Sequence, residues 1–192
     1  SLKLRDPSCN VTVIERNRAD DTFGWGVVLS DETLANLRSN DPDSADLIGQ
    51  HFAYWDDIAL IHMGQRLVSG GHGFCGIGRR KLLLILQERA SELGVNLSFE
   101  TECDDIDALC ATHDLVVAAD GVNSRIRARF EDSFGPEIDR RACKFVWLGT
   151  KQKFDDAFTF IFEETEHGWV WAHAYQFDEN TATFIVECSE AT

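Results

Sequence analysis

The segment whose residue types most directly suggest chemistry is VVAADGVNSRIRARF, residues 116–130. Its apolar run ends at Asp120 and Gly121, and three arginines alternate along the residues that follow: Arg125, Arg127 and Arg129. Guanidinium groups are suited to phosphate oxygens. Because the protein carries a formal net charge of −15, a basic segment directly after a buried strand must be explained by a ligand or by local pairing.

Local roles for these residues remain open. Ser124 stands where it would cap a short helix. Arg125 and Arg129 fit solvated positions of that helix. Arg127 could form an ion pair with Asp120, in which case it would serve no ligand.

A second candidate is the glycine-rich segment GHGFCG, residues 71–76, which has the G-x-G-x-x-G spacing of dinucleotide-binding loops. It precedes a helix, and that helix leads to a strand that ends in Glu100. The strand expected before it, residues 65–69, is short and contains Arg66, whereas a dinucleotide fold requires a buried central strand. We therefore interpret this segment as a glycine-rich loop that leads into a helix.

Glu15 is the better candidate for an acid that binds a ribose. It ends the β-branched run VTVIE, residues 11–15, and helix residues precede this run. A carboxylate can accept hydrogen bonds from both ribose hydroxyls. If Glu15 has this role, the glycine loop that belongs with it lies before Ser1, and the chain begins inside its first βαβ unit.

Aromatic residues alternate along two neighbouring strand candidates near the C-terminal end. The first carries Phe158, Phe160 and Phe162, and the second carries Trp169, Trp171, His173, Tyr175 and Phe177. A period of two places each set on one face of a hairpin. This face is either a wall for an aryl substrate or a sheet core packed on helices. His173 is interpreted as a satisfied pocket or core residue, and no catalytic proton acceptor is assigned.

Length and composition describe the frame that positions these residues. The 192 residues, 44% apolar and 27% charged, suffice for one large domain or for one domain and part of another. No segment approaches the roughly 18 apolar residues of a membrane span, and the first residues resemble neither a signal nor a transit peptide. We expect a cytoplasmic protein that binds no membrane. The acidic balance also argues against nucleic acid as a partner.

The six cysteines are scattered without paired spacing, so we expect reduced thiols rather than disulfides. Cys103, Cys110 and His113 are the nearest approach to a metal-ligand cluster. Their spacing matches no zinc pattern, and we therefore expect no metal site.

Periodicity and turn residues predict the elements of the chain. Leu82, Leu83, Leu86 and Ala90 are expected to share the apolar face of the clearest helix, and Gly94 is expected to end it. The expected elements are a strand at 11–15, a helix opened by Ser30, strand pieces at 54–69 with a hairpin around Met63 and Gly64, a helix at 79–93, a strand at 95–100, a short acidic helix, a buried strand at 114–119, and long strands from Cys143 onward.

Helices between short strands give way to period-two strands in the last third of the chain, which indicates an α/β (α+β) protein. We expect an α/β layer at residues 1–130. Residues 131–192 are expected to form the start of a mainly antiparallel sheet domain.

Three segments, in this order and spacing, resemble the single-component flavoprotein aromatic hydroxylases with the p-hydroxybenzoate hydroxylase fold. They are VTVIERNR, the helix pattern of Arg79, Leu82 and Leu86, and DGVNSRIR, which matches D-G-x-x-S-x-x-R. Within that family, ERNRADDTFGWGVVLSDETL, SGGHGFCGIGRRKLL, CKFVWLGT and FEETEHGW are most similar to the salicylyl-CoA 5-hydroxylase and 2-aminobenzoyl-CoA monooxygenase branch. The resemblance covers essentially the whole chain.

The resemblance implies a role for each candidate residue. Asp120, Gly121 and Arg127 would belong to the part of the protein that binds FAD and uses NAD(P)H. Glu15 would bind the adenosine ribose, with Arg16 and Arg79 on the adenosine and phosphate side. The FGWG loop, with Gly24 and Gly26, would lie close to the flavin or the substrate ring, and Trp169, Trp171 and His173 would line the substrate pocket.

The resemblance also implies a partial Rossmann-like three-layer FAD domain followed by a sheet-based substrate domain. In such enzymes NAD(P)H reduces the flavin, O2 forms a C4a-hydroperoxyflavin, and one oxygen is transferred to an electron-rich ring. The substrate would be a small aromatic molecule, with a CoA thioester as one option. Candidate cations for the CoA phosphates are Arg140, Arg141, Lys144, Lys151 and Lys153.

Two family motifs, the N-terminal glycine loop and a later Gly-Asp motif, have no counterpart in the chain, which predicts an internal fragment that is itself inactive. Exposed apolar edges would then favour association, including a homo-oligomer. Two alternatives remain. One is a non-catalytic truncated module, and the other is a different FAD oxidoreductase of this fold, although Trp169-Val-Trp171 lacks the Ile-Pro that a flavin-dependent halogenase would show next.

Overall fold

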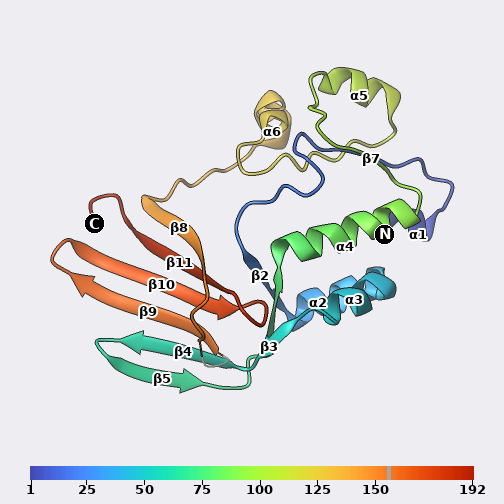
Figure 1. The fold of residues 1–192 in the computed structure, drawn as a ribbon. Coiled ribbons are helices and arrows are strands. Elements are labelled where there is room, and N and C mark those ends of the chain that lie inside the picture. Colours follow the sequence, from blue (N-terminus) through green and yellow to red (C-terminus); the bar gives the residue numbers. More distant parts are fainter. Residues whose placement is uncertain (155–156) are drawn as a thin grey trace.

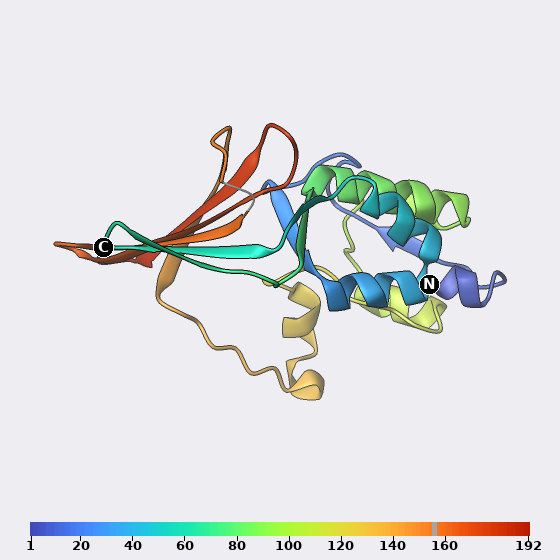
Figure 2. The ribbon, with the colours of Figure 1, turned by 90° about the horizontal axis from the view of Figure 1, so that it is seen from below.

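The structure is a computed structural model that describes residues 1–154 and 157–192. Figure 1 shows two regions: a large sheet, which carries the C-terminus, and a helical region, which carries the N-terminus. Seen from below, the sheet extends away from the helices, and a long loop between α7 and β8 joins the two regions (Figure 2).

The helices belong to the N-terminal two thirds of the chain. Ser30 accepts a hydrogen bond from Thr33 N and so caps α2, and Asp41 accepts one from Ser44 N and caps α3. The helices are α1 (Leu2–Arg5), α2 (Asp31–Asn40), α3 (Pro42–Gly49), α4 (Arg79–Glu92), α5 (Ile106–Thr112), α6 (Arg125–Arg129) and α7 (Glu131–Phe134).

A three-stranded sheet, ordered β2-β6-β3, connects the helical region to the large sheet. Its strands are β2 (Gly26–Ser30), β3 (Ala53–Trp55) and β6 (Phe74–Gly78). Ile77 of β6 packs with Ile48 of α3 and Ile85 of α4 in the buried core of this region. This core fixes the start of α4 relative to the strands, because Gly78 ends β6 and caps the helix.

The large sheet has the order β5-β4-β9-β10-β11-β8. Its neighbours are antiparallel, except that β4 and β9 run parallel. The strands are β4 (Asp57–His62), β5 (Gln65–Ser69), β8 (Cys143–Thr150), β9 (Ala157–Thr165), β10 (Gly168–Gln176) and β11 (Ala182–Ser189). Because β4 and β5 come from before residue 130, the sheet draws on both halves of the chain. The domain boundary at that residue stays a prediction.

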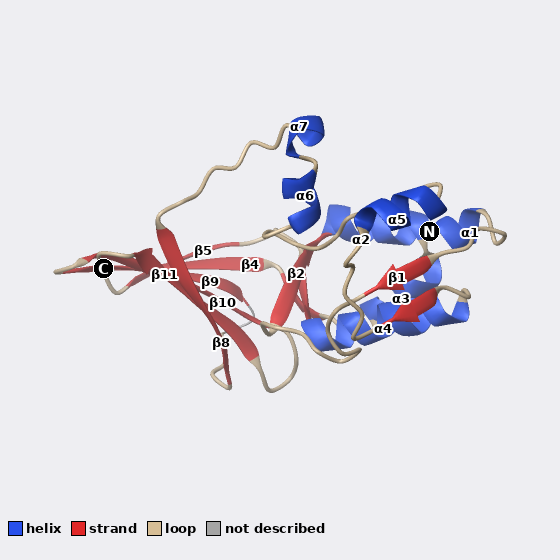
Figure 3. Cartoon of the chain, turned by 90° about the horizontal axis from the view of Figure 1, so that it is seen from above, coloured by secondary structure: helices blue, strands red, loops and turns tan. Residues whose placement is uncertain are grey.

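A third, two-stranded sheet pairs β1 (Thr12–Ile14) with β7 (Asn96–Ser98) in parallel. Figure 3 shows these short strands among the helices, at a distance from the large sheet. Val13 and Ile14 of β1 remain 45% and 37% exposed. The α/β fold class is confirmed, as are the expected hairpin at Met63 and Gly64, the helix that Gly94 ends, and the short helix that Ser124 caps.

The expected buried strand at residues 114–119 is wrong. This segment forms no strand, and Leu115 and Val117 are 69% and 75% exposed. The physical reason is that β1 pairs only with β7 among the described residues, so no neighbouring strand lies beside residues 114–119 to accept and donate backbone hydrogen bonds.

Two further expectations are corrected. The glycine-rich segment is a loop only up to Gly73, because residues from Phe74 onward form β6. It is not a dinucleotide fingerprint, since Gly76 lies in the middle of a three-stranded sheet rather than in a loop at a helix N-terminus. The apolar face of α4 is centred on Ile85, which is 4% exposed, while Leu86 is 42% exposed.

Candidate functional site

The Asp-Gly turn is held by its own side chains. Asp120 accepts hydrogen bonds from the Ser124 hydroxyl at 2.6 Å and from the backbone N–H of Arg125 at 2.9 Å. Hydrogen bonding by Ser124 is the largest of the effects that keep the pKa of the Asp120 carboxyl below its ordinary value. Gly121 has a φ of 87°, a backbone conformation that residues other than glycine adopt only with strain. The sequence thus builds a tight, fixed turn directly before α6.

Arg127 is not paired with Asp120. Its guanidinium donates to the carbonyl oxygen of Val122, and its backbone N–H donates to the Ser124 hydroxyl. The neighbouring arginines differ from it, because Arg125 pairs with Glu102 and Arg129 pairs with Asp107, both at 2.7 Å. The ion pair of Arg127 with Asp120 that the sequence left open therefore does not form.

A groove of about 400 Å³ opens beside this turn. Its apolar wall is formed by part of the segment 114–119, which was expected to be a strand and is a loop. Its polar groups come from the turn and from Arg127. The lining residues are Val116, Val117, Ala118, Asp120, Gly121, Ser124, Arg127 and Phe134. Three predicted cofactor residues, Asp120, Gly121 and Arg127, thus lie together.

Glu15 lies immediately after β1, as the sequence predicts. One carboxylate oxygen, Oε1, accepts hydrogen bonds from the backbone N–H of Asn17 at 2.7 Å and from its side-chain amide at 2.8 Å. The second oxygen, Oε2, makes no hydrogen bond among the described residues. Arg16 beside it is exposed. Glu15 and Arg16 therefore form a separate polar site, on a different element from the groove.

Arg79, at the first position of α4, contacts the FGWG loop. Its Nε donates to the Thr22 hydroxyl at 3.1 Å, and its guanidinium carbon lies 5.2 Å from the ring centre of Phe23 and 5.9 Å from that of Trp147. Its backbone N–H donates to the Trp25 carbonyl at 2.8 Å. Arg79 thus stacks on aromatic rings where the helical region meets the large sheet.

The glycines of the FGWG loop make room for rings of this chain. A Cβ atom on Gly24 would lie 2.7 Å from the Trp147 ring, and one on Gly26 would lie 2.5 Å from the Phe177 ring. The loop is also tied to the sheet, because Gly26 N donates to the Thr183 hydroxyl at 3.0 Å and the Tyr175 hydroxyl donates to Gly26 O at 2.8 Å. Contact of these glycines with a bound ring stays a prediction.

The alternating aromatic residues share one face of the large sheet, as the sequence predicts. Trp171 pairs with Phe162 and His173 pairs with Phe160 across β9 and β10. The ring centres of Trp171 and His173 lie 5.2 Å apart, and those of Phe160 and His173 lie 6.0 Å apart. Trp169 lies further along the strand, half exposed, and stacks on His62. Trp171 and His173 therefore form the centre of an aromatic face, with Trp169 at its outer end.

The expectation that His173 is a satisfied residue is wrong. Its Nδ1 is buried without a hydrogen-bond partner among the described residues, at 3.8 Å from Glu187 Oε1. Burial lowers the pKa of the imidazole, and the nearby Glu187 carboxylate opposes this effect only in part.

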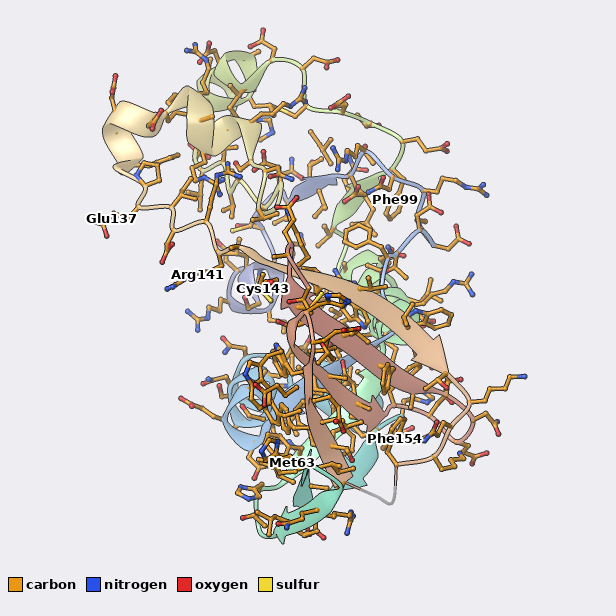
Figure 4. The ribbon with its side chains drawn as sticks, turned by 90° about the vertical axis from the view of Figure 1, so that its left-hand side faces the viewer. Met63, Phe99, Glu137, Arg141, Cys143 and Phe154 are labelled. Carbon is orange, nitrogen blue, oxygen red and sulfur yellow. The ribbon has the colours of Figure 1, made fainter. Side chains whose placement is uncertain are left out.

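The five candidate cations for a CoA thioester do not form one cluster. Arg140, Arg141 and Lys144 lie near the start of β8, whereas Lys151 and Lys153 follow its end. Eight residues of extended strand separate the two groups by about 24 Å. Figure 4 shows Glu137, Arg141 and Cys143 in succession along the segment that enters β8. Arg141 pairs with Asp139 at 2.7 Å.

The described residues, 1–154 and 157–192, contain no cluster of His, Cys, Asp and Glu that could hold a metal ion. The six cysteines are free. Within the same residues, no helix is long and apolar enough to cross a membrane.

Salicyloyl-CoA 5-hydroxylase from a Streptomyces species is 44% identical over 186 residues, which are 97% of this chain and 36% of the relative. The chain is similar to three curated proteins, which are named as a hydroxylase or as monooxygenases. No family model matches it.

Solved structures agree with this relationship at the level of the fold. The tetrameric form of 2-methyl-3-hydroxypyridine-5-carboxylic acid oxygenase has a TM-score of 0.78 at 20% identity and covers 99% of this chain and 55% of its own. PqsL from Pseudomonas aeruginosa, described as "a probable FAD-dependent monooxygenase", has a TM-score of 0.68 at 17% identity and covers 97% of this chain and 56% of its own. These likenesses show that the chain shares its fold with both proteins.

The chain spans 36% to 51% of the length of the curated monooxygenases it matches, which agrees with the expectation of a fragment.

Sequence reasoning missed two residues that the structure adds to the aromatic face, Trp147 and Glu187. Trp147 lies within the quoted segment CKFVWLGT. Glu187 interrupts the apolar strand FIVEC, and a charged residue in such a strand was the signal that could have identified it.

Proposed function

We propose that the full-length protein containing this chain is an FAD-dependent monooxygenase that hydroxylates an aromatic substrate with NAD(P)H and O2. The observation that carries this proposal is 44% identity, along 97% of the chain, to a protein named salicyloyl-CoA 5-hydroxylase. The match spans 186 of the 192 residues, so it is not confined to the groove, the FGWG loop or the aromatic face alone.

The groove beside the Asp-Gly turn supports a flavin-binding role for three residues. Nothing lies within 4 Å of the position of a Cβ on Gly121, so a ligand can approach the backbone there. The guanidinium of Arg127 has no acidic partner among the described residues, and phosphate oxygens would complete its hydrogen bonding. Asp120 holds the turn that presents both residues. These features fit the diphosphate region of a flavin or of NAD(P)H.

Glu15, Arg16 and Arg79 complete the proposed cofactor residues. The free Oε2 of Glu15 can accept a ribose hydroxyl, and the exposed Arg16 lies beside it. Arg79 has planar aromatic neighbours on its guanidinium, which leaves its edge for hydrogen bonds. Bound FAD would supply reduction by NAD(P)H and activation of O2.

The aromatic face is proposed as the substrate wall. Gly24, Gly26, Trp169, Trp171 and His173 would orient an aromatic ring and exclude water from it. A CoA thioester is the finer proposal for the substrate, because the relative acts on salicyloyl-CoA by its name. Either group of cations beside β8 could contact the CoA phosphates, but their separation means that one phosphate group cannot use both.

The proposal includes a cytoplasmic homo-oligomer. Apolar side chains on β1 of the parallel sheet and on β8 remain exposed, among them Val13, Phe145 and Val146. Surfaces of this kind are typical of contacts with further protein.

Variants of Arg127 test the flavin site. In the full-length protein, Arg127→Gln should weaken FAD binding about ten- to hundredfold, because it removes one charge-assisted contact to phosphate. Arg129→Gln is the matched control, since Arg129 lies two residues on in the same helix but pairs with Asp107. FAD affinity is measured by quenching of flavin fluorescence. Equal affinities for the two variants would remove Arg127 from the flavin site.

A further inference from the structure

His173 and Glu187 are a base and an acid, both partly buried, on a face otherwise made of rings. Strand register brings them together. His173 lies opposite Ile185 of β11, and Glu187 is two residues further, so both side chains lie on the same face as diagonal neighbours. The side chains are 17% and 24% exposed.

The two ring nitrogens of His173 have different surroundings. Nδ1 is fully buried and lies 3.8 Å from the Glu187 carboxylate. Nε2 is not among the buried unpartnered atoms and has no hydrogen-bond partner within the described chain, so it is open to a ligand. A carboxylate beside Nδ1 favours the tautomer with its proton on Nδ1, which leaves Nε2 as an acceptor.

Aromatic rings surround this acceptor. Phe158, Phe160 and Trp171 have ring centres 5.8, 6.0 and 5.2 Å from that of His173. Rings of this kind bind a planar aromatic group by stacking and edge contacts. A hydrogen-bond acceptor in their centre selects a ring that carries a donor.

We propose that Nε2 of His173 accepts the proton of a phenolic hydroxyl on the bound aromatic ring, with Glu187 as the residue that positions the imidazole. This proposal rests on the proposed function and assigns the substrate to the phenols. The O–H bond of the phenol breaks and its electron pair stays on oxygen, while a new N–H bond forms at Nε2. The phenolate is the more electron-rich ring for oxygen transfer, and Glu187 stabilises the imidazolium.

The charged groups near this dyad are few. Glu187 is the charged side chain that acts on His173 among the described residues, and the thiol of Cys143 contacts the other oxygen of Glu187 at 3.7 Å. Tyr175, two residues from His173, donates its hydroxyl to Gly26 O, and burial raises its pKa. Burial lowers the pKa of the imidazole and so favours its neutral form, which is the form that can accept a proton.

The test measures ionisation of a bound phenol in the full-length, FAD-loaded protein. The probe is 4-nitrophenol, whose phenolate absorbs visible light, titrated over pH with wild type, His173→Gln, Glu187→Gln and His167→Gln. His167 is the matched control, since it also lies beside a glutamate, Glu166, but on the exposed turn between β9 and β10. The ionisation constant of the bound probe should be at least tenfold higher than in free solution for wild type and for His167→Gln. This increase should be lost in His173→Gln and reduced in Glu187→Gln.

A chemical rescue separates proton transfer from a structural role. His173→Ala should lose hydroxylation, and added imidazole should restore part of it, because imidazole can occupy the space and accept the proton. If His173→Gln leaves probe ionisation unchanged while wild type still hydroxylates, or if wild type does not bind 4-nitrophenol, the His173 proposal is overturned and the proposed function stands. If wild type binds FAD but yields no hydroxylated product with any aromatic substrate, the proposed function itself has failed.

Discussion

Asp120 and Arg127 illustrate how little of the site depends on charge pairing within it. The Asp120 carboxylate is occupied by Ser124 and by backbone N–H groups, so it builds the turn and leaves Arg127 without an acid. This arrangement is local in sequence, and the sequence predicted the Ser124 cap but left the pairing of Arg127 with Asp120 open. The contact of Glu187 with His173 depends on the register of two strands, which no local pattern specifies.

Asp41 anchors α4 to the α2–α3 corner. Arg89 donates to both of its oxygens at 3.1 Å, and this hydrogen bonding is the main cause that lowers the Asp41 pKa to about 2. Asp41 is 8% exposed. Because the folded pKa is depressed, the stabilisation is present above the unfolded value of about 4 and is lost as pH falls toward 2.

Asp41→Asn in the full-length protein should therefore lower the free energy of unfolding by about 2 kcal/mol at neutral pH. The difference from wild type should shrink as pH falls from about 4 toward 2. Urea unfolding at several pH values measures this. Asp46→Asn, which breaks the exposed pair with Arg38, is the control and should cost less than 1 kcal/mol. A constant difference across this pH range would contradict the account.

Gly24 tests the close approach of the FGWG loop to the sheet. Its φ of 82° and the Trp147 ring at 2.7 Å leave no room for a side chain. Gly24→Ala should destabilise the protein by about 1–3 kcal/mol. Differential scanning calorimetry measures the change. Gly64→Ala, with a similar φ but nothing within 4 Å, provides the control for backbone strain alone and should cost less.

At the scale of elements, β6 decides how the glycine-rich segment is understood. The sequence suggested a dinucleotide loop and the polar strand before it argued against one. The structure shows a strand whose glycine lets Trp55 pack across it. The strand was missed because its pairing partners, β2 and β3, are distant in sequence. The segment 114–119 shows the converse, since strong β propensity without a neighbouring strand produced none.

Gly76→Ala and Gly71→Ala separate these interpretations. A Cβ on Gly76 would lie 2.8 Å from Trp55 and 3.0 Å from the Gln176 carbonyl oxygen, so this variant should lower the thermal midpoint markedly. Gly71 has open space around it, and its substitution should cost only the strain of its positive φ, about 1 kcal/mol. Neither should change FAD affinity in the folded protein. A selective loss of FAD binding in Gly71→Ala would restore the dinucleotide interpretation.

At the scale of the whole molecule, the groove lies on the loop and short helices of residues 116–134, whereas the aromatic face lies on the large sheet. The FGWG loop and Arg79 connect α4 of the helical region to the large sheet, because the loop packs on Trp147 of β8 while Arg79 begins α4. The period-two pattern predicted the aromatic face, and the motif order predicted the family. The joining of β4 to β9 across about a hundred residues could not be predicted, because parallel pairing of distant strands leaves no local signal.

The most direct test of the central claim is the source of the oxygen in the product. The full-length protein, loaded with FAD, is given NADH or NADPH, isotopically labelled O2 and phenolic aryl-CoA thioesters or free phenols, and the products are analysed by mass spectrometry. The account predicts a ring-hydroxylated product that carries one labelled oxygen atom. Oxidation of the nicotinamide with FAD bound, but without labelled oxygen in any aromatic product, would contradict it.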